Sequence, residues 1–161
     1  MSDLKQVGMA ELKVVRSPDK LITAGLGSCI GICLIDKTAQ VGGMAHIMLP
    51  SSLQARNALN RAKFADTAVE DLISEMEKMG AVSRRIVAKI AGGSQMFKVS
   101  AVSEVLKIGI RNSQAVEEAL AQSRIRLLAK DTGGNFGRTI IFDTESGDLQ
   151  VRTIGHGEKI I

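Results

Sequence analysis

Hydrophobic residues along much of the chain either alternate with polar ones or run together in short blocks, a pattern typical of β-strands. The block from Cys29 to Ile35 is almost entirely β-branched or small and apolar, which predicts a strand buried on both faces. A second strand is expected from Val41 to Leu49, closed by Pro50. A turn at Asp36-Lys37-Thr38-Ala39 would join the two strands into a β-hairpin.

Further strands are predicted at Met9 to Val15, Arg85 to Ala91, Ile125 to Ala129, Thr139 to Phe142 and Leu149 to Ile154, the last two forming a second hairpin. The glycine-rich stretch from Thr23 to Gly27 is not expected to stay regular for long.

Helical spacing is found in two places. Apolar residues recur every three or four positions from Phe64 to Met79, and Gly80 is suited to end that helix. A second helix is expected from Asn112, which can act as an N-cap, to about Gln122. The chain has no repeat, low-complexity tract or linker. We therefore predict a single domain over residues 1–161, an α/β fold with a mixed β-sheet sandwich flanked by helices.

Composition and charge narrow the class of protein. The 161 residues are 45% hydrophobic and 24% charged, as in ordinary soluble domains. The net charge of +4 is spread along the chain, and without Trp or Tyr a base-stacking surface is not expected, so nucleic acid is not a predicted partner. The longest apolar run, from Ala24 to Ile35, contains three glycines and is too short to cross a bilayer. We expect a cytoplasmic protein without membrane insertion.

The two cysteines, Cys29 and Cys33, do not fit a redox or metal pair. Four residues apart on one strand, their Cα atoms would be about 13 Å apart, beyond the roughly 7 Å that a disulfide spans. With only two Cys and two His, a zinc site would need every one of them or added carboxylates, so no metal or cofactor is expected. Cys33, in the middle of an apolar strand, is predicted to lie in the core.

Cys29 has two interpretations. It could pack in the core like Cys33, or it could act as a nucleophile, because it follows a flexible glycine-rich stretch. Backbone N–H groups around Gly27 and Ser28 could then form an oxyanion hole beside the thiol.

His46 favours the second interpretation. If the hairpin loop runs from Asp36 to Ala39, Cys29 lies directly opposite His46, with Cβ atoms about 4.5–5.5 Å apart. An imidazole at that distance could hold a thiolate–imidazolium pair and make the thiol reactive below its ordinary pKa. The alternative is a histidine satisfied within the core. His156, between two glycines, is expected to be exposed to solvent.

A third group should orient the imidazole. Thr23, on the glycine-rich approach to Cys29, could do so, and Asp131 and Asn135 are alternatives that the sequence does not rank. The Gly92-Gly93 and Gly133-Gly134 pairs match no phosphate-binding motif and are interpreted as walls of the site.

Several separated motifs, in the same order, resemble the CheD family, chemoreceptor glutamine deamidases of bacterial and archaeal chemotaxis. They are Thr23-Ala24-Gly25-Leu26-Gly27-Ser28-Cys29, the segment 42–50 containing Ala45-His46-Ile47-Met48-Leu49-Pro50, segments 64–68 and 89–97, Ile108-Gly109-Ile110-Arg111-Asn112, and segment 131–138. The similarity covers nearly the whole chain. It implies a fold similar to the catalytic domain of deamidating cytotoxic necrotizing factors.

The resemblance also implies roles for single residues. Cys29 would be the nucleophile, His46 its base and Thr23 the third catalytic member. Phe64 stands where tyrosine is expected, so any role of that hydroxyl is absent, and the segment from Ser51 to Arg61 is the least family-like part.

The implied partners are methyl-accepting chemotaxis receptors, as substrates, and CheC, a phosphatase that acts on phosphorylated CheY. Met96 and Phe97, after a glycine loop, are either a partner contact or part of the core. The resemblance leaves two other functions open, a binding regulator of CheC and a receptor methylesterase. We expect the free protein to be a monomer.

Overall fold

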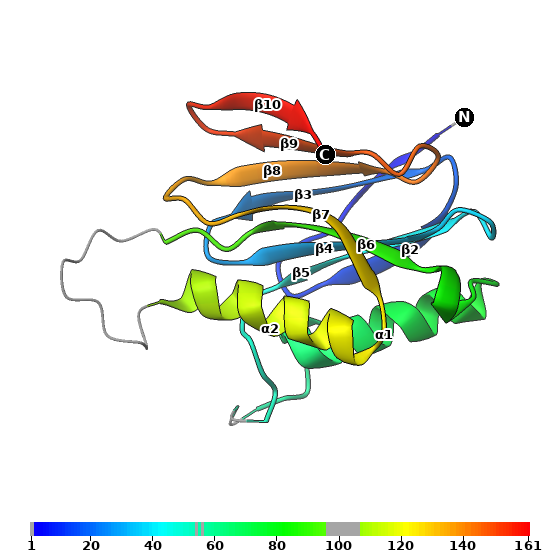
Figure 1. Ribbon diagram of the computed structural model, residues 1–161, viewed down its shortest axis with the longest axis horizontal. Coiled ribbons are helices and arrows are strands. Elements are labelled where there is room, and N and C mark those ends of the chain that lie inside the picture. Colours follow the sequence, from blue (N-terminus) through cyan, green and yellow to red (C-terminus); the bar gives the residue numbers. More distant parts are fainter. Residues whose placement is uncertain (1, 54, 56, 96–106) are drawn as a thin grey trace.

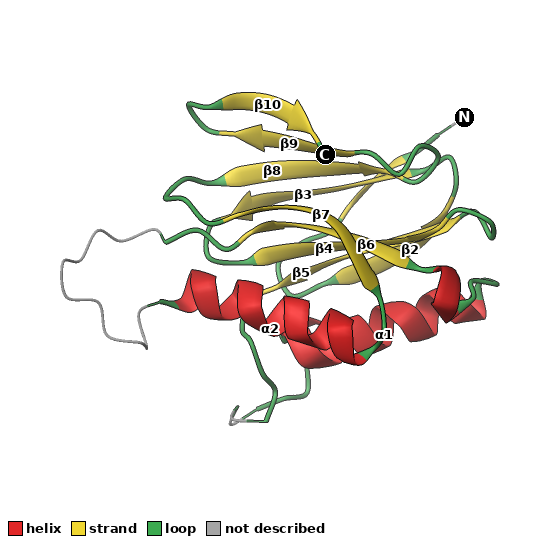
Figure 2. Ribbon diagram, in the orientation of Figure 1, coloured by secondary structure: helices red, strands yellow, loops and turns green. Residues whose placement is uncertain are grey.

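A computed structural model describes residues 2–53, 55, 57–95 and 107–161 (Figure 1). Over these residues the chain forms ten strands in two five-stranded sheets, together with two α-helices. Figure 2 shows both helices on one side of the sheet that contains β4 and β5, with the other sheet on the opposite side. The predicted mixed α/β sandwich is therefore confirmed.

The first sheet has the strand order β1-β3-β8-β9-β10. Its strands are β1 (Leu4–Gln6), β3 (Lys20–Leu26), β8 (Arg138–Asp143), β9 (Leu149–Thr153) and β10 (Gly157–Ile160). All neighbours are antiparallel except β1 and β3.

The second sheet has the order β2-β5-β4-β6-β7, and only β6 and β7 are parallel. Its strands are β2 (Leu12–Arg16), β4 (Ile30–Asp36), β5 (Val41–Ile47), β6 (Val87–Gly92) and β7 (Arg126–Thr132). The helices are α1 (Ala65–Lys78) and α2 (Ile108–Gln122), with short 3-10 turns at Arg61–Lys63 and Ser83–Arg85.

Strand β4 lies at the centre of the molecule and is buried over its whole length, as its apolar sequence predicts. Its side chains alternate between two cores. Ile30, Ile32 and Leu34 pack in the core under the helices. Cys33 and Ile35 pack in the core between the two sheets.

Most predicted strands are present with bounds shifted by one to three residues, and Cys29 lies just before β4 and not within it. The larger differences concern three strands. Residues 23–26 are part of β3, although a glycine-rich stretch was expected to be irregular. The pairing of β3 with β8 shifts between Thr23 and Leu26, and this irregularity accommodates Gly25, whose φ is +72°, within the strand. Strands β1 and β10 were missed because they are three and four residues long and exposed throughout, so they show no alternation.

Helix α2 begins at Ile108, four residues before the predicted cap at Asn112. Asn112 is therefore an interior helical residue, and it is fully buried. Its side chain contacts other segments of the chain, as described below.

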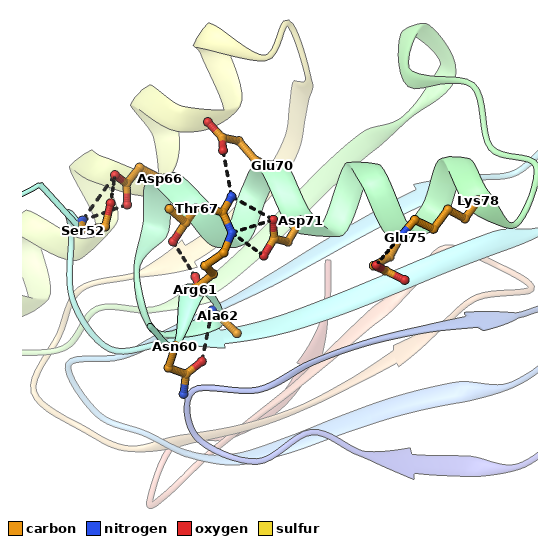
Figure 3. A network of polar contacts seen from close by, with 10 residues as sticks. All are labelled: Ser52, Asn60, Arg61, Ala62, Asp66, Thr67, Glu70, Asp71, Glu75 and Lys78. Atoms are coloured by element: carbon orange, nitrogen blue, oxygen red, sulfur yellow. Dashed lines mark hydrogen bonds and ion pairs between the residues drawn. The ribbon is translucent and has the colours of Figure 1, made fainter. Parts of the chain in front are cut away.

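The segment before α1, whose conformation the sequence left open, is tied to that helix by polar contacts (Figure 3). The backbone N–H and the hydroxyl of Ser52 both donate to the Asp66 carboxylate in the first turn of α1. The Arg61 guanidinium binds Asp71 and Glu70 one turn further on. These contacts fix both ends of the segment 52–61 against α1.

Asp36, the last residue of β4, is a fully buried carboxylate with several partners. It accepts hydrogen bonds from the backbone N–H groups of Ala39 and Val82, at 3.1 and 2.9 Å, and pairs with Arg85 at 3.0 Å. Burial alone would raise the pKa of Asp36, but these donors outweigh it and hold the pKa below its ordinary value.

We expect Asp36→Asn to lower the free energy of unfolding at pH 7 by about 1.5–3 kcal/mol, because charge-assisted hydrogen bonds are lost. Since the pKa is lowered in the folded state, the wild-type advantage is full above the ordinary value of 3.8 and disappears as the pH falls below it. Urea unfolding at several pH values measures both effects. Asp148→Asn, at an exposed site, is the matched control, and equal stability of all three proteins at pH 7 would contradict the prediction.

Candidate active site

His46 lies in β5 and is fully buried at the junction of the two sheets. Its backbone N–H donates to the Glu11 carbonyl at 3.0 Å, and its own carbonyl accepts from the Ala10 N–H at 2.9 Å. The chain just before β2 therefore holds the backbone of His46 on both sides. The position of the imidazole is set by these bonds and by one side-chain contact.

That contact comes from Thr23 in β3, on the opposite sheet. Its Oγ1 lies 2.7 Å from His46 Nδ1 and 2.6 Å from the carbonyl oxygen of Val7. A hydroxyl has one hydrogen and the carbonyl can only accept, so the Thr23 hydroxyl donates to Val7 and Oγ1 accepts from Nδ1–H. The proton of the neutral imidazole is thus on Nδ1, and Nε2 carries the free lone pair.

The structure thereby separates the three candidates for the imidazole partner. Thr23 contacts His46, whereas the Asp131 carboxylate binds Arg138 at 3.1 Å and Lys159 at 2.9 Å. Asn135 is exposed. Within the described part of the chain, His46 Nε2 is buried and has no hydrogen-bond partner.

The predicted register of the β4–β5 hairpin is wrong by two residues. Asp36 pairs with Val41, so the loop runs from Lys37 to Gln40, and the residue opposite His46 is Gly31. Asp36 stays in the strand because its side chain is fixed there by buried hydrogen bonds. Cys29 still points to the same face as His46, since the shift is even, but on the diagonal, where two residues are about 7–8 Å apart and their Cβ atoms somewhat closer.

Gly31 marks the close approach of the two sheets beside His46. A Cβ at this position would lie 2.4 Å from Cδ1 of Ile140 and 3.3 Å from Cδ1 of Leu26, both on the opposite sheet. Only glycine leaves room for these side chains here. The close approach is what allows Thr23 to reach His46 from the other sheet.

Cys29 lies just before β4 and is 8% exposed. Burial raises the pKa of its thiol, with a smaller opposing effect from its own backbone N–H, and burial lowers the pKa of His46. The expected thiolate–imidazolium pair is therefore not favoured in the free protein. We therefore expect a neutral thiol and a neutral imidazole in the free protein, because burial in the same closed environment disfavours the charged form of each.

The loop that carries Cys29 is held by its carbonyl groups. Three consecutive carbonyls accept hydrogen bonds of 2.9 Å, that of Gly27 from the Ser94 N–H, that of Ser28 from Asn112 Nδ2, and that of Cys29 from the Gly93 N–H. In a planar trans peptide the N–H points away from the carbonyl. The N–H groups of Ser28 and Cys29 therefore point the other way, and in the described residues neither donates to another residue.

The glycine pair at the end of β6 lies against this loop, as the sequence predicted. A Cβ on Gly92 would lie 2.2 Å from the carbonyl oxygen of Cys29. Asn112, in contrast, was missed as a residue of the site. Its only signal in the sequence is its place at the end of the Ile108–Asn112 motif.

The remaining candidates lie away from this centre. Cys33 is a free thiol with no exposed surface, so the prediction that it belongs to the core is confirmed. His156 is exposed, as predicted, and its ring stacks on Phe136 at 4.6 Å between centroids. Met96 and Phe97 lie outside the described residues.

No helix in the described ranges is long and apolar enough to span a membrane. Nor do the same residues contain a group of three or more His, Cys, Asp or Glu side chains that could hold a metal ion.

Residues 48–153 match a family described as CheD chemotactic sensory transduction. A probable chemoreceptor glutamine deamidase CheD from Syntrophomonas wolfei is 65% identical over 161 residues, which is the whole of both chains. Proteins of the same name are 54% identical in Desulfitobacterium hafniense, again over both whole chains, and 51% in Clostridium novyi, over 97% of this chain and 96% of that one. These matches place the protein in chemotactic signal transduction. The chain belongs to the CheD family, and the resemblance of its motifs is confirmed.

A solved structure has a similar fold. The crystal structure of Neisseria meningitidis protein NMB0706, of the family DUF152, superimposes with a TM-score of 0.54 over 83% of this chain and 64% of that one, at 8% sequence identity. At this identity the similarity concerns the fold alone.

The raised pKa of the Cys29 thiol leads to a prediction about its reactivity with an alkylating reagent. Alkylation of Cys29 by iodoacetamide needs the thiolate, so in the free protein we expect the rate to reach its midpoint above pH 9.0, the ordinary value for the thiol. Cys33→Ala should give the same profile, since Cys33 has no exposed surface. A midpoint well below about 8.5 would show a preformed thiolate and contradict the assignment of a neutral pair.

Proposed function

We propose that this protein converts glutamine side chains of methyl-accepting chemotaxis receptors to glutamate, with Cys29 as the nucleophile. The observation that carries the proposal is the chain of contacts from the Val7 carbonyl through Thr23 to Nδ1 of His46, which leaves Nε2 as a buried base with no hydrogen-bond partner among the described residues. Membership of the CheD family, whose relatives are named as chemoreceptor glutamine deamidases, supports the same reaction.

In the proposed mechanism the thiol of Cys29 attacks the carboxamide carbon of the substrate glutamine while its proton moves to His46 Nε2. Because burial disfavours both the thiolate and the imidazolium, this proton transfer accompanies the attack and does not precede it. The N–H groups of Ser28 and Cys29 stabilise the oxyanion of the tetrahedral intermediate.

Collapse of the intermediate breaks the carbon–nitrogen bond, and the imidazolium gives its proton to the departing nitrogen, which leaves as ammonia. The substrate is then a thioester of Cys29. Water attacks the thioester with His46 as base, which releases glutamate and restores the thiol. Each turnover adds one carboxylate to the receptor, and every proton transfer uses groups of this chain, so the mechanism requires no cofactor.

The role of Thr23 follows from its two hydrogen bonds. Thr23 accepts a hydrogen bond from Nδ1–H and so keeps the free lone pair on Nε2. It also stabilises the imidazolium that forms during attack.

We also propose that the protein acts as a cytoplasmic, single-domain monomer with a fold similar to the catalytic domain of deamidating cytotoxic necrotizing factors. Family membership is the support for these further points.

The direct test is mass spectrometry of receptor cytoplasmic fragments incubated with the protein. We expect mass gains of about one unit at specific glutamines, because an amide nitrogen is replaced by oxygen. Cys29→Ala should abolish these gains, and Cys33→Ala, whose side chain lies in the inter-sheet core, should keep them in the folded protein. Activity that survives Cys29→Ala, or that is lost with Cys33→Ala in a folded protein, would overturn the assignment.

We propose CheC as a second partner, on the basis of the family membership, with Met96 and Phe97 as the contact. Aromatic and methionine side chains are enriched in the cores of protein interfaces, and these two are adjacent in the sequence. Phe97→Glu should weaken CheC binding at least tenfold in a calorimetric titration while deamidation of receptor fragments continues. Unchanged affinity for CheC and receptor in a folded variant would show that Met96 and Phe97 do not form the interface.

A further inference from the structure

Asn112 makes two hydrogen bonds that join separate parts of the site. It lies in the second turn of α2 with no exposed surface, and its Nδ2 donates to the carbonyls of Ser28 at 2.9 Å and Met48 at 3.0 Å. Both partners are carbonyl oxygens, which can only accept. The orientation of the amide is thereby fixed, since Oδ1 in the place of Nδ2 would face two lone pairs.

The two acceptors lie close in sequence to the two reacting residues of the proposed mechanism, Cys29 and His46. Ser28 directly precedes the nucleophile, and Met48 lies two residues after His46 on the segment that follows β5. Asn112 therefore links the loop of Cys29 to the segment that follows the strand of His46. It does so from a helix that is more than sixty residues away from either segment in the sequence. Close packing supports this link, because a Cβ on Gly109, in the first turn of α2, would lie 2.2 Å from the Ser94 carbonyl.

The other atom of the amide shows that the residue is not optimised for stability. Asn112 Oδ1 is buried and, within the described part of the chain, has no hydrogen-bond partner. A buried acceptor without a partner is unfavourable, and an apolar side chain of similar size would avoid it. The useful part of Asn112 is therefore its pair of N–H donors.

We propose that Asn112 is a positioning residue that orients the Ser28–Cys29 peptide for catalysis. By holding the Ser28 carbonyl, it directs the N–H of Cys29 to the opposite side, where the oxyanion forms in the proposed mechanism. The inference rests on the proposed function. It adds to that function a residue that acts through its hydrogen bond to the Ser28 carbonyl.

The test compares kcat, KM and the rate of Cys29 alkylation in Asn112→Asp, which keeps the size of the side chain and, as the carboxylate, lacks both N–H donors. We expect kcat for deamidation of receptor fragments to fall about 10- to 100-fold, because an oxyanion donor is misdirected, while KM stays within about threefold. Alkylation of Cys29 by iodoacetamide should also stay within about threefold, because that displacement at carbon forms no oxyanion. Asn112→Ala is measured in parallel, with the same expectation, in case the buried carboxylate prevents folding.

The matched control is Val116→Ala, one turn further along the buried face of α2. Val116 packs in the core under the helices and has no hydrogen-bonding group for either carbonyl, so its truncation is expected to loosen α2 without redirecting the Ser28–Cys29 peptide. At a temperature where circular dichroism shows the variant to be folded, its kcat should stay within about twofold of the wild type.

The outcomes separate this inference from the function on which it rests. No deamidation by the wild type would overturn the proposed function and this inference with it. Wild-type kcat in a folded Asn112→Asp or Asn112→Ala would overturn the inference alone. So would a loss of kcat matched by an equally large change in alkylation, or a failure of both variants to fold, since either would show a structural role only.

Discussion

The hydrogen bond between Thr23 and His46 is the contact on which the site depends. It joins the two sheets, and it also determines which nitrogen of the imidazole carries the proton. It forms only where the sheets come close, beside Gly31, and where β3 continues through its glycine-containing irregularity. The Val7 carbonyl accepts the hydroxyl hydrogen of Thr23, so in the Thr23–His46 hydrogen bond the hydroxyl oxygen is the acceptor. A backbone group from the N-terminal segment thus determines which nitrogen of His46 is free.

The closed packing around this contact disfavours charge on the thiol and on the imidazole, so we expect both to be neutral in the free protein. His46 and Thr23 have no exposed surface, and Cys29 has very little, so neither a thiolate nor an imidazolium is solvated there. In the proposed mechanism, charge is favoured only when a substrate carbonyl is present to receive the attack and N–H groups are in place for the oxyanion. In that mechanism the reactivity of the thiol depends on the substrate.

The sequence predicts the parts of this structure that depend on local pattern. The burial of β4 follows from its continuous apolar run, the hairpin with β5 from the turn residues between the strands, and helix α1 from its periodicity. Cys29, His46 and Thr23 stand out through their motifs and the glycines around them. The register could not be predicted, because it depends on Asp36 being buried against Val82 and Arg85, residues more than forty positions away. The same holds for Asn112, whose helix brings it to Ser28 and Met48 only in the folded chain.

The protonation of His46 is the most direct test of this account. Long-range proton–nitrogen NMR correlation distinguishes Nδ1–H from Nε2–H, and assignment is simple because His156 is the only other histidine. We predict a proton on Nδ1, a bare Nε2 and a pKa below the ordinary 6.5 in the free protein, with Nδ1–H no longer favoured in Thr23→Val. A wild-type imidazole protonated on Nε2, or a tautomer unchanged by Thr23→Val, would contradict the account.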